Sequence, residues 1–548
     1  MATNIDEITP ATEALDLSFQ RLATLPAQVV QATQLKVLIL ERTRLKTLPA
    51  TIVQLQNLKE LNLSGNLLKE LPQEVTKLKS LQALNLKMND LKTLPQTFGR
   101  LQNLQRLNLD GNLLKILPLV ITEMKGLNRL NLGNNQLKTL PLTMIQLDSL
   151  QWLNLVYNHL ETIPEVVLRL KNLEWLSLMN NELRRFPQII SELKKLKTLY
   201  LSNNQLQTLS SAVGQFKNLE WLDLEENKIE KLPQEIEALK NLQILNLGEN
   251  ALEQLPREFG QLQNLVQLNL GHNRFQAFPQ VILSLTGLKS LGLSFNQLKE
   301  LPPNIGQLQN LQVLSVRNNE IKTLPQEVIQ LKKLEGLNLS YNGFKTLPQE
   351  VTKIENLKYL TLYGNQFQEL SPAIGQLKKL ERLIIADNKL QALPQSFGQL
   401  KNLKVLILSL NQFQTIPPEV IQLENLEQLN IDHNQLEVIP SNIGQLKKLR
   451  ILALDKNHFQ TLPLTIDQLK YLEFLSLGQN QFAKFPSIIF QLKALRFLEL
   501  SYNQLKEIPQ GIVQLKNLKE LRLYNNPLNK EFKQKIKRWL PKCHVQFD

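Results

Sequence analysis

The chain contains few of the residues that build disulfides, metal sites or catalytic centres. Among its 548 residues there is one cysteine, Cys543, so no disulfide can form within the chain. Its five histidines are scattered, and none stands in HxH or HExxH spacing. A GxxxxGK phosphate loop and a GxSxG nucleophile elbow are absent too. We therefore expect no enzyme activity, no cofactor and no metal site.

Long apolar runs are also missing. No stretch approaches the roughly 20 apolar residues that a membrane-spanning helix needs, so we expect no membrane insertion. The first residues, MATNIDEITPATEALDLSF, lack a basic segment followed by an apolar one, and no signal peptide is visible. A single cysteine and no leader fit a cytoplasmic protein, and equally a secreted or surface-exposed one from which a leader was removed.

What the sequence does contain is a 23-residue unit that repeats almost from end to end. In the copy Leu58–Ser80, LKELNLSGNLLKELPQEVTKLKS, the frame reads LxxLxLxxNxLxxLPxxΦxxLxx, where Φ is Ile, Val, Phe or Met. The asparagine of this frame recurs every 23 residues from Asn66 to Asn526, giving 21 copies in register. A fixed period of this length indicates a solenoid, in which one continuous core runs through stacked coils.

Each part of the unit predicts one part of a coil. The alternating LxL segment is typical of a strand with one buried face, and stacked coils would place these strands side by side in a parallel sheet. The asparagine follows the strand, and its amide can satisfy buried backbone groups of neighbouring coils. In the return segment a proline fixes φ, and Φ and leucine three residues apart suit a short 3₁₀ or helical turn. Only Ser210 and Ser371 replace the proline.

These features predict an α/β solenoid that curves, because its two sides differ in width. Residues 1–11 form a polar lead-in, residues 12–528 form 22 full coils and a final half-coil, and residues 529–548 form a C-terminal cap. The first coils are atypical, with Gln20 and Thr43 in place of the asparagine, as expected of units that close a core.

The last segment has a different pattern. Phe532, Ile536, Trp539 and Leu540 stand at helical spacing, with lysines and an arginine opposite them. A basic helix that binds a membrane or nucleic acid fits this pattern, but we favour a capping helix, because an uncapped solenoid end would expose its core. Residues 544–547, HVQF, can add a short edge strand.

The frame LxxLxLxxNxL over residues 12–528 resembles the leucine-rich-repeat family, and the LP…Φ…L return is similar to its 23-residue, Ras-group class. The near-identical copies and the ending NNPLNKEFKQKIKRWLPKCHVQF look closer to the repeat-only proteins of pathogenic spirochaetes. This resemblance implies a right-handed horseshoe or arc with a concave parallel β-sheet and convex 3₁₀, short-helical or extended returns. It also implies binding of other macromolecules, with a bacterial host-interaction protein as one form of that function.

The variable positions of the strand are where specificity can lie. Counting each coil from its first leucine as zero, positions 2, 4, 6 and 7 face the sheet surface. Trp152, Trp175 and Trp221, three of the four tryptophans, all stand at position 2. Neighbouring strands put the first two about 5 Å apart in backbone, close enough for ring contact. The leucines already fill the core, so these rings must face outward.

Exposed aromatic residues with a polar rim are typical of interaction hot spots. The candidate partner-binding residues are Trp152, Tyr157, Trp175, Met179, Tyr200, Trp221, Asp223, Glu225 and Glu226, and Glu249 extends the acidic rim. The alternative is that the rings only shield the sheet and stack on one another.

Three further surfaces stand out. A looser aromatic set and an apolar C-terminal set offer a second contact surface or a route to self-association, and many lysines stand at position 11. The aromatic set is Phe295, Tyr341, Tyr359 and Tyr363; the apolar set is Val405, Ile407, Leu410, Ile451, Phe474, Phe497 and Tyr502; the lysines include Lys46, Lys69, Lys92, Lys115 and Lys138. For the lysines we favour a solvated flank.

The leading hypothesis is a non-enzymatic protein–protein interaction module or scaffold, which buries its aromatic surface against a protein partner. The formal net charge of +14 leaves a rival open, the binding of a glycosaminoglycan or nucleic acid through the flank lysines, although nucleic acid is the less favoured partner. The other rival is homotypic assembly through the C-terminal apolar residues.

Overall fold

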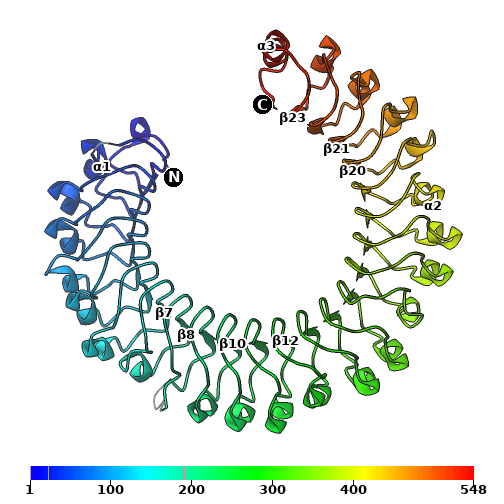
Figure 1. Cartoon of the computed structure of the whole chain (residues 1–548). Helices are drawn as coiled ribbons and strands as arrows, with labels where there is room; N and C mark the ends of the chain where they lie inside the picture. Colours follow the sequence, from blue (N-terminus) through cyan, green and yellow to red (C-terminus); the bar gives the residue numbers. More distant parts are fainter. Residues whose placement is uncertain (1, 23, 189–192) are drawn as a thin grey trace. The chain divides into compact units, whose positions relative to one another are not determined.

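The computed structural model describes residues 2–22, 24–188 and 193–548. Met1 of the expected lead-in and residues 189–192 of one return segment lie outside the described residues. The chain divides into two compact units, Met1–Arg274 and Phe275–Asp548. Each unit is a stack of coils that curves so that its strands line the concave side (Figure 1).

In the first unit every coil contributes one three-residue strand to a parallel sheet, and consecutive strands pair in register. The strands are β1 (Ala14–Asp16), β2 (Val37–Ile39), β3 (Glu60–Asn62), β4 (Ala83–Asn85), β5 (Arg106–Asn108), β6 (Arg129–Asn131), β7 (Trp152–Asn154), β8 (Trp175–Ser177), β9 (Thr198–Tyr200), β10 (Trp221–Asp223), β11 (Ile244–Asn246) and β12 (Gln267–Asn269).

The second unit repeats the arrangement. Its strands are β13 (Ser290–Gly292), β14 (Val313–Ser315), β15 (Gly336–Asn338), β16 (Tyr359–Thr361), β17 (Arg382–Ile384), β18 (Val405–Ile407), β19 (Gln428–Asn430), β20 (Ile451–Ala453), β21 (Phe474–Ser476), β22 (Phe497–Glu499), β23 (Glu520–Arg522) and β24 (His544–Gln546).

Short helical turns fill the opposite, convex side. In the first unit they are η1 (Ile5–Glu7), α1 (Ala27–Gln31), η2 (Ala50–Gln54), η3 (Gln73–Lys77), η4 (Phe98–Arg100), η5 (Leu119–Glu123), η6 (Leu142–Gln146), η7 (Val167–Arg169), η8 (Ser211–Gln215), η9 (Gln234–Ala238) and η10 (Arg257–Gln261). In the second they are η11 (Gln280–Ser284), η12 (Pro303–Gln307), η13 (Gln326–Gln330), η14 (Val351–Lys353), η15 (Pro372–Gln376), η16 (Gln395–Gln399), α2 (Pro418–Ile421), η17 (Ile443–Gln445), η18 (Leu464–Gln468), η19 (Ser487–Gln491), η20 (Gln510–Gln514) and α3 (Lys530–Trp539). The predicted solenoid, with strands on one side and mostly 3₁₀ returns on the other, is confirmed.

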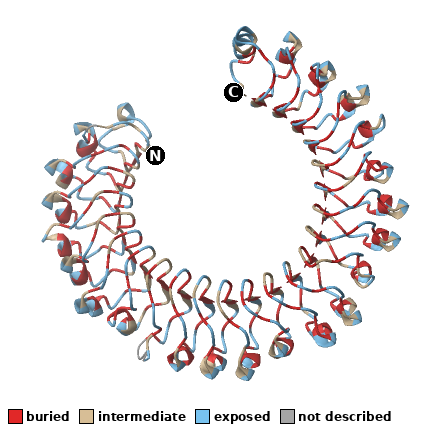
Figure 2. Ribbon diagram, in the orientation of Figure 1, coloured by how far each residue is buried: buried red, intermediate tan, exposed pale blue. Residues whose placement is uncertain are grey.

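The frame leucines form the core of both units. In the coil of β7, Leu150, Leu153 and Leu155 are buried, while the alternate residue Trp152 is only half-buried. Figure 2 shows the buried positions in a continuous band between the strands and the convex turns. Because the period of a strand is two residues, every position 2 and position 4 side chain is displayed on the strand face.

The frame asparagines join each coil to the one before it. The side chain of Asn112 donates to the carbonyl oxygens of Leu86 (3.0 Å) and Leu109 (2.9 Å), and its Oδ1 accepts from the backbone N–H of Leu91 (3.0 Å). Equivalent bonds recur along the chain, so the predicted bonding of the asparagine amide to neighbouring coils is confirmed. Asparagine can make both kinds of bond because its primary amide is both a donor and an acceptor.

Proline starts each return turn by presenting a carbonyl oxygen. Pro72, for example, is the N-cap of η3, and its oxygen accepts from the N–H of Val75 at 3.2 Å. Where serine replaces proline, its carbonyl oxygen still accepts this bond, and its side chain adds a second acceptor. The hydroxyls of Ser210 and Ser371 accept from backbone N–H groups two residues on, each at 3.3 Å.

The C-terminal segment forms the expected helix and strand. Helix α3 starts with the side chain of Asn529, which accepts from the N–H of Phe532 at 2.8 Å, and it buries Ile536 completely. Strand β24 then pairs with β23 in parallel, and Phe547 beyond it lies against Lys533 and Lys537.

Candidate partner-binding site

Four aromatic rings follow one another on the strand face of the first unit. The rings of Trp152 and Trp175 stack with centroids 4.4 Å apart and an interplanar angle of 12°. Tyr200 then lies 5.6 Å from Trp175 on one side and 5.6 Å from Trp221 on the other. We call Trp152, Trp175, Tyr200 and Trp221 the aromatic ladder. The expected contact between the first two rings is confirmed.

The aromatic ladder is only partly covered by protein. Trp221 is 37% exposed, and the other three side chains are half-buried. Burial and the charge of the Asp223 carboxylate raise the pKa of Tyr200, so its hydroxyl stays protonated and neutral. The ladder therefore presents stacked and tilted aromatic rings, with the Tyr200 hydroxyl as a hydrogen-bond donor.

The structure places two further predicted residues beside the ladder, where the strands end. Tyr157 is 55% exposed and has a left-handed backbone with φ of 52°, and its N–H donates to the carbonyl of Met179 at 3.0 Å. The side chain of Met179 is half-buried. Both residues thus lie past the ends of their strands, Tyr157 at position 7 and Met179 at position 6 of their coils.

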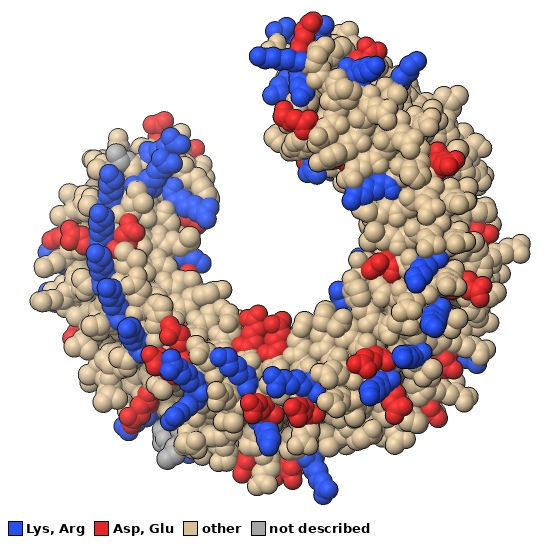
Figure 3. All heavy atoms as spheres, viewed as in Figure 1, with Lys and Arg blue, Asp and Glu red and all other residues tan. Residues whose placement is uncertain are grey.

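Acidic residues gather at the Trp221 end of the ladder. We call Asp223, Glu225, Glu226 and Glu249 the acidic patch, and Figure 3 shows acidic side chains together on this inner edge. Asp223 is buried and accepts from the Ser202 hydroxyl at 3.1 Å, so the three glutamates present the accessible carboxylates. Within the described part of the chain, none of the four forms an ion pair with a cation.

Burial shifts the protonation of two members of this patch. Burial raises the pKa of Asp223, although hydrogen bonds from Glu225 N–H, Ser202 and Asn246 oppose the shift. Burial also raises the pKa of Glu225, and the nearby carboxylates of Asp223, Glu249 and Glu226 add to it. Burial and the neighbouring carboxylates thus disfavour the charged forms of Asp223 and Glu225, and within the described residues no cation pairs with either of them.

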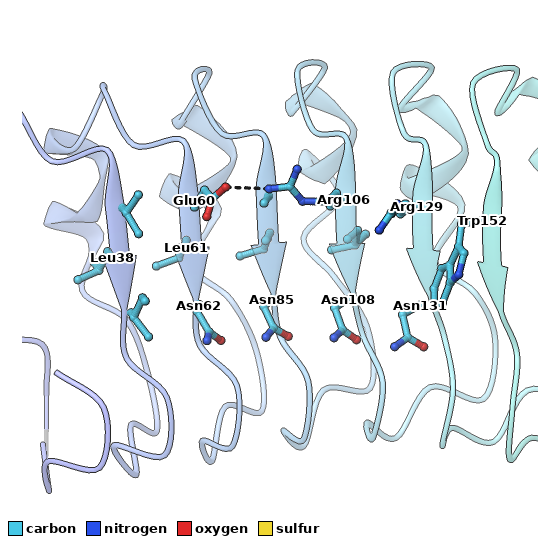
Figure 4. Close-up of a pocket in the computed structure, with 15 residues that line it drawn as sticks. Leu38, Glu60, Leu61, Asn62, Asn85, Arg106, Asn108, Arg129, Asn131 and Trp152 are labelled. Atoms are coloured by element: carbon cyan, nitrogen blue, oxygen red, sulfur yellow. Dashed lines mark hydrogen bonds and ion pairs between the residues drawn. The ribbon is translucent and has the colours of Figure 1, made fainter. Parts of the chain in front are cut away.

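A groove that the repeat pattern did not indicate lies at the opposite end of the ladder. A hollow of about 410 Å³ lies on the strand face of the first unit and is bounded by Trp152. Its charged residues are Glu60, Arg106 and Arg129, which Figure 4 shows in one row leading to Trp152. We call it the arginine groove. Comparison of position 2 in successive coils would have found the two adjacent arginines.

One arginine of the groove is neutralised and the other is not. Arg106 pairs with Glu60, two coils away, at 2.7 Å. Arg129 is exposed beside it, in register with Arg106 on one side and Trp152 on the other. Among the described residues no carboxylate pairs with Arg129. The groove therefore retains one unneutralised guanidinium.

A row of amides forms the other wall of the arginine groove. The Oδ1 atoms of Asn85, Asn108 and Asn131 accept from the backbone N–H two residues further on, at 3.1, 3.0 and 3.1 Å. Only an oxygen can accept those bonds, so each NH₂ group is left as an outward donor. Within the described residues these donors have no protein acceptor, and Figure 4 shows the three side chains aligned.

Lysines form a separate row on the flank of the first unit. Lys46, Lys69, Lys92, Lys115 and Lys138 are exposed and stand one coil apart. Figure 3 shows basic side chains in a line along this flank. None of the five pairs with a carboxylate among the residues that the structure describes.

The second unit has its own aromatic surfaces. Phe474 and Phe497 stack at 4.4 Å, and the guanidinium of Arg522 lies 4.8 Å from the Phe497 ring. Tyr341 and Tyr363 are in edge contact at 5.1 Å. These rings therefore pack against other side chains of the second unit.

The described residues include neither a metal-binding cluster nor a membrane-spanning helix. No group of three or more histidine, cysteine, aspartate or glutamate side chains is placed to hold a metal ion there. Over the same residues, every helix is too short or too polar to cross a bilayer.

Comparison with known families identifies the class of protein. Residues 204–291, 280–357, 345–437 and 437–538 match a family described as leucine-rich repeat region, and residues 10–68, 56–114 and 171–229 match one described as leucine rich repeat. The chain belongs to the leucine-rich-repeat family. No curated protein sequence matches it.

Several solved structures resemble the chain. A leucine-rich-repeat protein of Leptospira interrogans is 35% identical, with 84% of this chain and 95% of that chain covered and a TM-score of 0.48. The plant peptide hormone receptor RGFR1, solved with RGF2, is 27% identical over 98% of this chain and 95% of its own, with a TM-score of 0.58. The Arabidopsis receptor kinase HAESA, solved with the peptide hormone IDA and the co-receptor SERK1, is 30% identical over 90% and 87%, with a TM-score of 0.58.

Proposed function

We propose that this chain is a non-enzymatic interaction module that binds a protein or peptide partner on the strand face of its first unit. The observation that carries the proposal is the aromatic ladder, which is stacked and half-exposed. In this proposal the coils of residues 12–528 carry the binding surface, and residues 1–11 and 529–548 close the ends of the core.

A stacked ladder suits binding because it is already ordered. Tryptophan and tyrosine offer a large contact area with few rotatable bonds, so little side-chain entropy is lost when a partner covers them. The carboxylates and arginines at either end would orient the partner and speed its association. The similarity to RGFR1 and HAESA, each solved with a peptide hormone, supports a peptide-binding role.

The test is replacement of Trp152, Trp175 and Trp221 by alanine in one variant. We expect partner affinity to fall at least about thirtyfold, because one hot-spot residue alone is worth about 2 kcal/mol or more. The partner is captured by wild type and variant side by side, identified by mass spectrometry, and its Kd is then measured by calorimetry.

The matched control replaces Val313 and Tyr359 by alanine, since both are exposed at position 2 in the second unit. This control variant should bind as wild type does. The thermal midpoints of both variants should stay near that of wild type, because the replaced side chains lie outside the core. Equal affinity of wild type and triple variant would overturn the proposal.

The lysine row supports a second candidate function, binding of a sulfated glycan or another polyanion. Five unpaired cations one coil apart can neutralise a regularly spaced polyanion, and such binding weakens steeply with salt. Replacement of Lys69, Lys92 and Lys115 by glutamate should then abolish retention on heparin, whereas the triple tryptophan variant should still be retained. No retention of wild type at low salt would exclude this function.

A further inference from the structure

The strand face of the first unit is electrically polarised along the aromatic ladder. The arginine groove lies at the Trp152 end, and the acidic patch lies beyond Trp175 and Tyr200 at the other end. The two charged regions are therefore separated by an apolar surface. A partner that covers the ladder meets both of them.

The arginine groove offers hydrogen-bond donors from both of its walls. One wall holds the guanidinium of Arg129, which has five N–H donors and no acceptor. The other wall holds the outward NH₂ groups of Asn85, Asn108 and Asn131. A group that fills this groove must be rich in acceptors, and a carboxylate meets both the charge and the geometry.

The acidic patch offers the opposite chemistry. Glu225 is fixed by a bond from the Asn246 side chain to its Oε2 at 3.0 Å. Glu226 and Glu249 are exposed beside it, and a carboxylate only accepts hydrogen bonds. A lysine or arginine side chain of a partner is the group that this end fits.

The separation of the two ends sets the length of the ligand. From Arg129 to Glu225 the path crosses four coils, roughly 19 Å at ~4.8 Å per strand, and about four residues along a strand, roughly 13 Å. The straight line is then roughly 23 Å, which an extended chain covers with about seven residues at ~3.3 Å each.

We propose that the first unit binds an extended peptide segment in one direction, with an acidic residue in the arginine groove and a basic residue on the acidic patch, about seven residues apart. This inference rests on the proposed function, because the residues between the two charges would cover the aromatic ladder. The reversed segment would bring like charges together at both ends, which costs affinity.

The test selects ligands from a displayed library of random 12-residue peptides on the full-length protein. Four proteins are used: wild type, Arg129→Glu, the double variant Glu226→Lys with Glu249→Lys, and the matched control Arg382→Glu, which stands exposed at position 2 in the second unit. Each enriched peptide is then synthesised forwards and with its sequence reversed, and Kd is measured by fluorescence anisotropy.

We expect wild type and the control to enrich peptides with one constant order of acidic and basic residues about seven apart. Arg129→Glu should replace the acidic residue by a basic one at that end alone, and the double variant should change only the other end. The reversed peptides should bind at least about tenfold more weakly, the effect of a misplaced charge pair. No enrichment, no constant order, or equal binding of reversed peptides would overturn the inference.

Binding of the enriched peptides to the triple tryptophan variant separates the two proposals. Peptides that lose affinity for that variant but show no charge order would leave the proposed function standing and overturn the direction. Ordered peptides that bind the triple variant as tightly as wild type would support the charged ends and overturn the role of the aromatic ladder.

Discussion

The frame asparagine links local sequence to the stacking of coils more directly than any other residue. Asn112 is 4% exposed, and its four contacts join three backbone segments across two coils. An apolar side chain of the same size could fill the space but could not replace the bonds, and an unsatisfied buried polar group is costly.

Replacement of Asn112 by alanine should therefore lower the free energy of unfolding by about 1–3 kcal/mol, because the buried N–H of Leu91 loses its partner. The carbonyls of Leu86 and Leu109 each lose one of two donors and keep the bond from Asn89 or Asn135. The measurement is urea unfolding followed by circular dichroism. Asn103→Ala is the matched control, since Asn103 is exposed and makes one bond, to the carbonyl of Lys79. A loss of stability for Asn112→Ala no larger than that for the control would show that water replaces the hydrogen bonds of the asparagine side chain.

Asp223 is a residue where binding and stability compete. The next coil has asparagine, Asn246, at the same position, and Asn246 accepts from the N–H of Gly248 much as Asp223 accepts from the N–H of Glu225. Asn in place of Asp223 can keep that acceptor and donate to the Ser202 hydroxyl. What the aspartate adds is a charge in a buried position.

We expect Asp223→Asn to raise the free energy of unfolding by about 0.5 kcal/mol at pH 7, as other changes to a consensus residue do. Burial raises the pKa of Asp223 in the folded state, so the wild type loses stability as pH rises through that pKa. The gain of the variant should thus vanish below the pKa of the unfolded chain, about 3.9. Thermal unfolding across a pH series measures it, and a gain that is constant with pH would contradict the electrostatic cause.

At the scale of elements, the repeat frame predicted nearly every strand and return turn. A strand with alternating leucines has only one face that it can bury, and a proline can only start the turn that follows. These inferences need the neighbours within one coil alone. The ring contact of Trp152 and Trp175 could also be predicted, because the fixed period places both residues at the same position of adjacent coils.

Features that depend on several coils at once could not be read in the same way. The arginine groove needs Glu60 to pair with Arg106 across the coil of Ala83, so that Arg129 is left without a partner. The left-handed backbone at position 7, seen at Tyr157 and Glu226, leaves no mark in the frame, because glycine, asparagine and bulky residues all occupy it. The pairing of side chains and the sign of the backbone angle φ are set by tertiary context.

At the scale of the molecule, repeats contact only their neighbours, so a substitution should destabilise only the coils near it. The aromatic ladder belongs to the first unit, and helix α3 follows the last coil of the second. Ile536 is the buried residue of α3, and Asp in its place would bury a charge with no partner. The last coils would then lose their cover while the coils of the ladder keep all their contacts.

Ile536→Asp should therefore destabilise the C-terminal coils by at least about 3 kcal/mol and leave the ladder intact. Hydrogen exchange reports on the C-terminal coils, and exchange of the amides in β22 and β23 should become faster. Circular dichroism reports on the aromatic ladder, and the exciton couplet of the stacked Trp152 and Trp175 rings should persist. Gln534→Asp, an exposed change on the same helix, should alter neither signal.

Because the proposed binding surface lies in the first unit, the Kd of a ladder-binding peptide should be equal for both variants and wild type. A loss of the couplet together with the C-terminal amides would show that the coils unfold as one cooperative array, and loss of peptide binding with an intact couplet would move the binding surface to the second unit.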